Sequence, residues 1–226
     1  IVMDDETPPP ELTVRVCDSL TCELLGAQKL LAQLPSKLGA NVRVVRAPCM
    51  GGCHNAPVVA IGHSLQEHAT VDSVADAVAE GETHPHPTSF PDLAAYRANG
   101  GYKLLEACVS GKMTRDALLK LLDDAQLRGL GGAGFPTGRK WRAVLAEPGP
   151  RLMAVNGDEG EPGTFKDRYY LERDPHRFLE GMLIGAWMIE ASDTYIYLRD
   201  EYPHVCEALA IEPWRDERSH FHELGL

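Results

Sequence analysis

Apolar positions in the first part of the chain alternate between strand spacing and helix spacing. Three short runs rich in β-branched residues predict strands, and two longer runs with apolar residues every three or four positions predict helices. The strands are residues 13–16 (TVRV), 42–45 (VRVV) and 56–62 (APVVAIG), and the helices are residues 24–34, ending before Pro35, and 71–79. Strands that alternate with helices predict an α/β domain.

The second half shows a similar alternation around one strongly apolar helix. We expect a leucine-rich helix at about 115–127, a helix at 141–147, a strand at 151–156 (RLMAVN), a buried helix that begins with Pro175 after Asp174, and a strand at 194–198 (TYIYL). The last three elements form a strand–helix–strand unit. In open α/β sheets, the loops at the carboxyl ends of such strands bind ligands.

A proline-rich segment separates the two halves. Residues 81–91 (GETHPHPTSFP) contain three prolines and no apolar period, which is typical of a linker. His84 and His86 in this segment are interpreted as surface residues, because no third metal ligand is near them in sequence. The predicted limits are residues 1–82 for the first domain, 83–104 for the linker and 105–226 for the second domain.

The charge balance and the lack of long apolar runs narrow the function classes. The 226 residues include 22 Lys and Arg against 33 Asp and Glu, a formal net charge of −11. We therefore expect no nucleic-acid partner, because the phosphate backbone would be repelled. No run approaches the roughly 20 apolar residues that cross a bilayer, and the start (IVMDDETPPP) does not resemble a signal peptide. The prediction is a cytoplasmic protein with no membrane partner.

Four cysteines lie in two pairs within the first domain. Cys17 and Cys22 form a C-x4-C pair after a strand, and Cys49 and Cys53 form a C-x3-C pair in the loop APCMGGCHNAP. Four converging thiolates bind a metal or an iron–sulfur cluster. A [2Fe-2S] cluster is favoured because neither spacing fits the C-x2-C knuckles of structural zinc, although zinc and a disulfide framework stay open as alternatives. The two other cysteines are interpreted as ordinary buried thiols: Cys108 and Cys206.

A glycine-rich run occupies residues 128–141 (RGLGGAGFPTGRKW). It matches G-x-G-x-x-G, but a helix rather than a strand precedes it, so a Rossmann fold is not expected, and the P-loop pattern also fails. Glycines let backbone N–H groups approach phosphate oxygens, a lysine on the next helix adds positive charge, and a phenylalanine can stack on a heteroaromatic ring. The candidate cofactor-binding residues of this run are Gly129, Gly131, Gly132, Gly134, Phe135 and Lys140.

Both parts of the sequence resemble known families. VCDSLTCELLGAQKLL…APCMGGCHNAPVVAIG resembles the thioredoxin-like [2Fe-2S] ferredoxin subunit of respiratory complex I, whose ligands match the four cysteines. The glycine-rich run and the loop at 156–168 (NGDEGEPGTFKDR) resemble the FMN- and NADH-binding flavoprotein subunit of complex I, of NAD-reducing hydrogenases and of NAD-dependent formate dehydrogenases. The implied α/β fold is a thioredoxin-like [2Fe-2S] ferredoxin domain followed by the N-terminal part of a complex I-type FMN-binding domain.

The resemblance also implies roles for the acidic loop, residues 156–168. Its matching residues are Asn156, Asp158, Glu159, Gly160 and Glu161. Asn156, Asp158 and Glu159 would accept hydrogen bonds from ring N–H and ribityl hydroxyl groups of FMN. Glu161 would face the nicotinamide amide or ribose. The family usually has Arg where this chain has Leu130, so one phosphate or ring contact of the family is not expected here.

The order of the two domains most resembles the β (diaphorase) subunit of soluble NAD-dependent formate dehydrogenases. That resemblance implies hydride exchange between NAD(H) and FMN without a catalytic acid, base or nucleophile, and single-electron exchange with iron–sulfur clusters. It also implies a molybdenum- or tungsten-containing α subunit as partner, and a further iron–sulfur subunit as an optional second partner. The alternatives are the same module in an NAD-reducing hydrogenase or NADH:quinone oxidoreductase, and a zinc-stabilised interaction domain without redox role.

Two motifs of the flavoprotein family are missing from the sequence. One is the later glycine and glutamate motif that completes the FMN site, and the other is the C-terminal cysteine motif that binds a [4Fe-4S] cluster. We therefore expect the chain to be an excerpt of a longer protein, with the [4Fe-4S] cluster in the missing C-terminal part.

Overall fold

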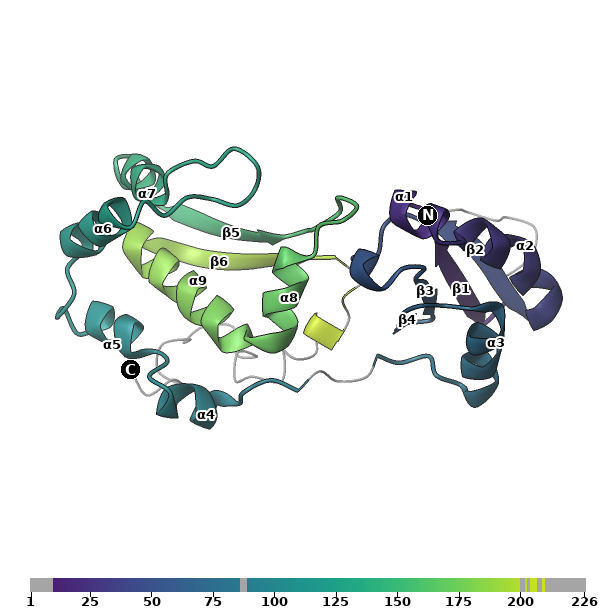
Figure 1. Ribbon diagram of the computed structural model, residues 1–226. Helices are drawn as coiled ribbons and strands as arrows, with labels where there is room; N and C mark the ends of the chain where they lie inside the picture. The colour runs from purple at the N-terminus through teal and green to yellow at the C-terminus, as the bar shows by residue number, and fades with distance from the viewer. Residues whose placement is uncertain (1–9, 86–88, 200–201, 203, 207–208, 210–226) are drawn as a thin grey trace. The chain divides into compact units, whose positions relative to one another are not determined.

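The computed structural model describes residues 10–85, 89–199, 202, 204–206 and 209 (Figure 1). These residues fall into two compact units. The first unit takes its described residues from 10–85, 158–169, 199, 202 and 204–206, and the second takes them from 89–157, 170–198 and 209. Across these stretches, no helix has both the length and the apolar character that crossing a membrane requires.

A four-stranded mixed sheet with strand order β2-β1-β3-β4 forms the frame of the first unit. Its strands are β1 (Leu12–Cys17), β2 (Val42–Ala47), β3 (Val59–Ile61) and β4 (Ser64–Gln66). β1 pairs in parallel with β2 and antiparallel with β3, and β3 pairs antiparallel with β4. The three strands expected from the β-branched runs are confirmed, and β4 is an addition.

The helices of this unit differ from the prediction at Pro35. They are α1 (Leu20–Leu24), α2 (Ala27–Leu38), the 3-10 turn η1 (Cys53–Asn55) and α3 (Val71–Glu80). The single helix expected at 24–34 is interrupted at Gly26, whose φ of 111° is left-handed, and α2 continues past Pro35. Leu34 is fully buried and Leu38 packs against the core, so apolar burial outweighs the hydrogen bond that proline removes.

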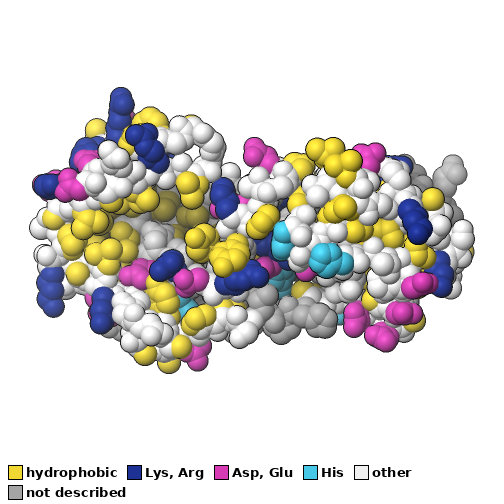
Figure 2. Space-filling model, viewed as in Figure 1, with side chains coloured by type: hydrophobic (Ala, Val, Ile, Leu, Met, Phe, Trp, Pro, Cys, Tyr) yellow, Lys and Arg dark blue, Asp and Glu magenta, His cyan; other side chains and the backbone are white. Residues whose placement is uncertain are grey.

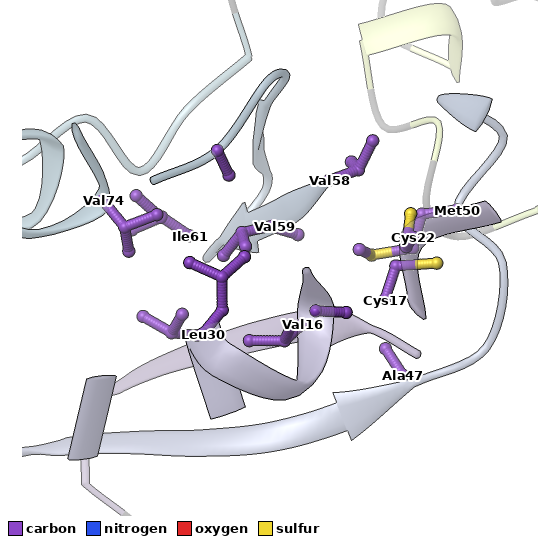
Figure 3. Close-up of a cluster of buried hydrophobic side chains, with 14 of the residues drawn as sticks. Val16, Cys17, Cys22, Leu30, Ala47, Met50, Val58, Val59, Ile61 and Val74 are labelled. Atoms are coloured by element: carbon purple, nitrogen blue, oxygen red, sulfur yellow. The ribbon is translucent and has the colours of Figure 1, made fainter. Parts of the chain in front are cut away.

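The core of the first unit lies between the sheet and the helices α2 and α3. Figure 3 shows Val16, Leu30, Val59 and Ile61 packed together, and the cysteines Cys17 and Cys22 beside Met50 near the end of this cluster. A capping box fixes the start of α3: the Thr70 hydroxyl accepts from Ser73 N at 3.1 Å, and Ser73 Oγ accepts from Thr70 N at 2.9 Å. Cys17 and Cys22 are thus part of the packed core at one end of the sheet.

A parallel strand pair and a buried helix form the centre of the second unit. Its elements are α4 (Leu93–Ala98), α5 (Lys103–Val109), α6 (Arg115–Asp124), α7 (Thr137–Leu145), β5 (Arg151–Gly157), α9 (Pro175–Ile189) and β6 (Ala191–Leu198). The remaining helix, α8 (Lys166–Arg173), follows the acidic loop. β5 and β6 pair in parallel on either side of α9 in sequence, which confirms the expected strand–helix–strand unit. The range 83–104, assigned to a linker, contains α4, and the domain limits stay a prediction.

One face of the β5–β6 pair is exposed. Leu152 is 61% exposed on β5, and Tyr195 and Tyr197 are 58% and 61% exposed on β6. In the space-filling view, hydrophobic side chains reach the surface in both units (Figure 2). Parallel strands are usually covered on both faces, whereas in the described residues this pair is covered on the face that packs against α9.

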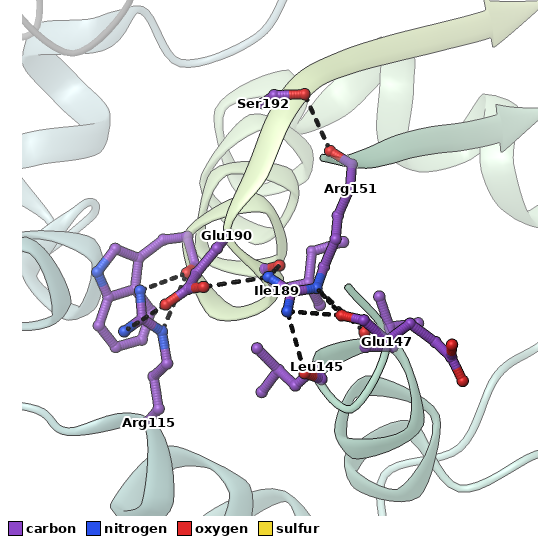
Figure 4. Close-up of polar contacts among 9 residues, drawn as sticks. Arg115, Leu145, Glu147, Arg151, Ile189, Glu190 and Ser192 are labelled. Carbon is purple, nitrogen blue, oxygen red and sulfur yellow. Dashed lines mark hydrogen bonds and ion pairs between the residues drawn. The ribbon is translucent and has the colours of Figure 1, made fainter. Parts of the chain in front are cut away.

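Arg151 joins the ends of three elements of the second unit (Figure 4). Its guanidinium donates to the carbonyl oxygens of Leu145 at 3.0 Å and Glu147 at 2.8 Å, where α7 ends, and to that of Ile189 at 3.5 Å, where α9 ends. It also pairs with the Glu190 carboxylate at 3.1 Å. A cation at two helix carboxyl ends is favourable because carbonyl groups there lack helical partners. Arg151 therefore anchors the helix that follows the glycine-rich run.

A partly buried carboxylate joins α4 and α5 to α9. Glu180 on α9 accepts hydrogen bonds from the Tyr96 hydroxyl at 2.7 Å and from the Tyr102 backbone N–H at 2.9 Å. The Tyr102 hydroxyl lies 3.1 Å from His176 Nδ1. Burial, followed by the hydrogen bond with Glu180, raises the pKa of Tyr96 above its ordinary value. These bonds give the short helices α4 and α5 a fixed place on the core.

Candidate functional site

The four paired cysteines lie at the end of the first unit's sheet. Cys17 is the last residue of β1, Cys22 lies in α1, Cys49 lies in the loop after β2, and Cys53 begins η1. Cys49 Sγ and Cys53 Sγ are 3.2 Å apart. The first three thiols are nearly fully buried, and that of Cys53 is partly exposed. Residues far apart in sequence thus place their sulfur atoms in one protected region.

Each thiol changes the proton affinity of its neighbours. A hydrogen bond with Cys22 lowers the pKa of Cys17 to about 6, and the same bond together with burial raises the pKa of Cys22. Burial also raises the pKa of Cys49 to about 11. The Cys17 and Cys22 thiols are therefore close enough to share a hydrogen bond.

The four paired thiols supply the kind of donor that a two-iron cluster needs. Within the described residues, no group of three or more His, Cys, Asp and Glu side chains is arranged to hold a metal ion. The Cys17–Cys22 and Cys49–Cys53 pairs together supply four soft thiolate donors, which is the donor set of a [2Fe-2S] cluster. Cys17, Cys22, Cys49 and Cys53 are free thiols that form no disulfide. Cys108 is buried as expected, but the expectation for Cys206 is wrong, because this residue is exposed next to buried Val205.

Two glycines of the cysteine loop are required by close packing. A Cβ atom at Gly52 would lie 2.8 Å from Val58 Cγ2. Gly51 has a φ of 77°, in the left-handed region, and a Cβ atom there would collide with the Tyr202 hydroxyl. Positions 51 and 52 of the loop between Cys49 and Cys53 therefore have no room for a larger residue.

Residues from the acidic loop and from the end of β6 contact the cysteine loop within the first unit. Arg199, which is 9% exposed, donates to the Cys49 carbonyl oxygen and to the Glu159 carbonyl oxygen, each at 2.6 Å. The Gly163 backbone N–H donates to Cys53 Sγ at 3.1 Å. The His54 and Phe165 rings are 4.5 Å apart. The second half of the acidic loop is thus held against the cysteine loop by several independent contacts.

Both carboxylate oxygens of Glu159 in the acidic loop accept hydrogen bonds from nearby backbone N–H groups. Its side chain is 1% exposed, and its two carboxylate oxygens accept from the backbone N–H groups of Asp167 at 3.0 and 3.2 Å and of Arg168 at 3.2 Å. Lys166 Nζ lies 3.6 Å away. A carboxylate at the start of α8 satisfies N–H groups that lack helical partners. This contact fixes the acidic loop, and the proposed contact of Glu159 with FMN stays a prediction.

The glycine-rich run forms a short closed loop in the second unit. Gly129 N donates to the Phe135 carbonyl oxygen at 2.9 Å, and Arg128 Nη1 donates to that of Gly134 at 3.0 Å. The Arg139 guanidinium lies 5.7 Å from the Phe135 ring centroid, and that ring is 47% exposed. Lys140 is exposed on α7, and an ion pair between Arg142 and Asp123 joins α7 to α6.

The glycines of this loop border open space. Cβ atoms at Gly131, Gly132 and Gly134 would meet no atom within 4 Å, and at Gly129 the nearest atom would be the Phe135 carbonyl oxygen at 3.8 Å. Gly132 and Gly134 have left-handed φ values of 99° and 58°. Exposed N–H groups, an aromatic face and a lysine at the start of a helix suit a phosphate-bearing ligand with a planar ring.

The candidate residues are divided between the two units. Asn156 lies at the end of β5 and belongs, with the glycine-rich loop, to the second unit, whereas Asp158, Glu159, Gly160 and Glu161 belong to the first. Asp158 is half exposed and lies 3.8 Å from Arg199 Nε, and Glu161 is exposed. The four paired cysteines lie together in the first unit. Sequence reasoning missed three residues at this site, Gly163, Arg199 and Tyr202, because no motif marks a contact between residues so distant in sequence.

Two domain families match this chain. Residues 3–82 match the thioredoxin-like [2Fe-2S] ferredoxin, and residues 122–219 match the Nuo51 FMN-binding domain. The mixed α/β fold class expected from the sequence is therefore confirmed. These families also confirm a [2Fe-2S] cluster and FMN as the cofactors of the two domains.

Proteins similar to this chain are subunits of NADH- and NAD-linked enzymes. One NADH-quinone oxidoreductase subunit of Aquifex aeolicus is 49% identical over 108 residues, 48% of this chain and 25% of that protein. Its namesake in Escherichia coli is 40% identical over 129 residues, 54% of this chain and 29% of that protein. The chain thus spans less than a third of the length of these relatives.

Solved structures of an NAD+-reducing [NiFe]-hydrogenase cover more of the chain. The air-oxidised state has a TM-score of 0.72 and 28% identity, over 91% of this chain and 40% of the hydrogenase chain. The H2-reduced state has a TM-score of 0.74 and 27% identity over the same shares. Both parts of the chain therefore have counterparts in one hydrogenase polypeptide.

Proposed function

We propose that this chain is the electron-transfer (diaphorase) part of an NAD-dependent oxidoreductase. The observation that carries the proposal is the occurrence, in one polypeptide, of two close thiol pairs in a ferredoxin-type domain and a glycine-rich loop in an FMN-binding domain. When bound, FMN accepts a hydride, which carries two electrons, from NADH and passes the electrons one at a time to iron–sulfur clusters, or the reverse. The protein's part is to hold and tune these groups.

The chain's own residues divide this work. Cys17, Cys22, Cys49 and Cys53 would hold the [2Fe-2S] cluster, since they supply its four thiolates. Lys140 and the open glycine backbone would bind phosphate, and the exposed Phe135 face would stack on a ring. Asn156, Asp158 and Glu161 would accept hydrogen bonds from ring, ribityl or ribose donors.

Within this class, the finer proposal is the β subunit of a cytoplasmic NAD-dependent formate dehydrogenase with a molybdenum- or tungsten-containing α subunit. The order of domains and the motif sequences support it. An NAD-reducing hydrogenase is the alternative that the structural similarity over 91% of the chain favours, and NADH:quinone oxidoreductase is the one that the curated relatives favour. Purification of the native complex and identification of its largest subunit separates the three, because each electron donor or acceptor needs a different partner.

The redox role is tested by spectroscopy and by activity. The chain purified without oxygen should show sulfur-to-iron charge-transfer bands that dithionite bleaches, with two irons per chain, whereas a colourless protein with stoichiometric zinc would support the non-redox alternative. The native complex, which would supply the missing part of the FMN site, should reduce a dye at the expense of NADH. Substitution Gly132→Val should abolish dye reduction, because the left-handed backbone and the open approach are both lost. Unchanged activity in this variant would rule out the glycine-rich loop as the nucleotide site.

A further inference from the structure

One buried hydroxyl group beside the cysteine loop has no partner in the described protein. Tyr202 is 1% exposed, and its hydroxyl makes no hydrogen bond to any residue that the structure describes. A buried hydroxyl without a partner costs about 1–3 kcal/mol, so native proteins rarely keep one without a reason. A phenylalanine would fill the same space without this cost.

The position of the Tyr202 ring is fixed by its neighbours. The ring centroid lies 5.8 Å from the Arg199 guanidinium and 5.9 Å from that of Arg168. The same Arg199 donates to the Cys49 carbonyl oxygen. The hydroxyl itself lies against Gly51, midway between Cys49 and Cys53, at the point where a Cβ atom would collide with it. Tyr202 is thus held with its hydroxyl at the loop that carries two of the four thiols.

The chemistry of the hydroxyl makes it a donor at neutral pH. Burial raises the pKa of Tyr202 to about 12, so its proton is retained. Two acceptors of the cysteine loop already have donors: the Cys49 carbonyl oxygen accepts from Arg199, and Cys53 Sγ accepts from Gly163 N–H. A bound cluster brings further acceptors to this loop, namely its sulfide and thiolate sulfur atoms.

We propose that the Tyr202 hydroxyl donates a hydrogen bond to a sulfur atom of the bound [2Fe-2S] cluster and raises its reduction potential. The inference rests on the proposed function, because it requires the cluster. Reduction adds one electron, and the added negative charge on sulfur strengthens a hydrogen bond from a fixed donor. Tyr202 therefore stabilises the reduced cluster more than the oxidised one, alongside the Gly163 N–H.

The test is the isosteric substitution Tyr202→Phe in the full chain with its cluster. A redox titration with dithionite and mediator dyes, followed by electron paramagnetic resonance, gives the one-electron midpoint potential. We expect the ratio of reduced to oxidised cluster at a fixed potential to fall about tenfold, which is about 59 mV for one electron. The matched control is Tyr96→Phe, which removes a bonded hydroxyl from the second unit and should leave the potential unchanged.

A second variant keeps the ring polar and tests the opposite direction. Incorporation of 3,5-difluorotyrosine at position 202 makes the hydroxyl a stronger donor, so the potential should rise. Iron content and the visible spectrum show that each variant holds its cluster. Potentials that stay at the wild-type value in both position-202 variants, with the cluster fully loaded, would overturn the proposal. A wild-type chain that holds no cluster would instead overturn the proposed function.

Discussion

Two loops of this protein contain two or more glycines, and the physical reason for glycine differs between the two loops. In the cysteine loop, added Cβ atoms would collide with Tyr202 at Gly51 and with Val58 at Gly52. In the glycine-rich loop, a Cβ atom at Gly131 or Gly132 would meet no atom within 4 Å. Close packing therefore excludes a side chain at positions 51 and 52, whereas in the second loop space is free and only the left-handed φ of Gly132 and Gly134 disfavours one.

The difference separates a loop held by packing from a loop with an open approach. The cysteine loop is surrounded by buried side chains and is held by the Arg199 and Gly163 hydrogen bonds. The glycine-rich loop is closed at its base by the Gly129–Phe135 hydrogen bond, and its tip is exposed. Open glycines at a loop tip are expected where a phosphate must approach the backbone closely.

The largest effect is expected from Gly51→Ala. The new methyl group collides with the buried Tyr202 hydroxyl and requires a left-handed backbone at φ 77°. Overpacking of a buried region costs about 1–3 kcal/mol and the left-handed conformation about 1–2 kcal/mol more. We expect a loss of about 3 kcal/mol in the free energy of unfolding, measured by urea denaturation, together with reduced iron content.

A double substitution checks the cause of this loss. In Gly51→Ala with Tyr202→Phe the colliding oxygen is removed, so part of the lost stability should return. If the double variant is as unstable as the sum of the two single variants, the collision is not the cause and backbone strain alone must account for the loss.

The sequence predicted the local parts of this comparison better than the contacts between distant parts. Strand β1, the strand–helix–strand unit and the cysteine pairs follow from periodicity and spacing, because these properties depend on residues near one another. The Arg199 contact with Cys49 spans 150 residues, and the capping of α8 by Glu159 depends on how the loop turns. Pro35 shows the opposite error: a local signal predicted the end of a helix, but burial of Leu34 and Leu38 extends it.

The next largest effect is expected from Arg151→Ala, which tests how α7, the helix that follows the glycine-rich loop, is anchored. Removing the guanidinium leaves the carbonyl oxygens of Leu145, Glu147 and Ile189 without this charged donor. Because hydrogen bonds from charged groups contribute about 1.5–3 kcal/mol, we expect a loss of about 2 kcal/mol in the free energy of unfolding. The control is Arg177→Ala, whose side chain is 70% exposed in an i,i+3 pair and should cost less than about 0.5 kcal/mol. Equal losses in the two variants would show that Arg151 does not anchor α7.

A smaller effect, dependent on pH, is expected from the buried thiol of the second unit. Burial raises the pKa of Cys108 above the ordinary thiol value of 9.0. The folded chain then holds this proton more tightly than the unfolded chain, so this contribution to stability is complete below pH 9.0 and is lost as the pH rises through the raised value. Urea denaturation between pH 8 and 11 should show a steeper loss in wild type than in Cys108→Ala. Iodoacetamide should modify exposed Cys206 well before Cys108, and equal rates would contradict the burial of Cys108.

The smallest change in stability, and the one of opposite sign, is expected from Gly131→Ala. The position has room for a methyl group and no left-handed φ, so alanine mainly restricts the unfolded chain. Such substitutions raise the free energy of unfolding by about 0.4–1 kcal/mol. If the glycines of this loop admit a phosphate, the same methyl group should weaken FMN binding about tenfold, or about 1.4 kcal/mol, measured by quenching of flavin fluorescence. A more stable variant that binds FMN as tightly as wild type would show that the open space beside Gly131 is not where the nucleotide approaches.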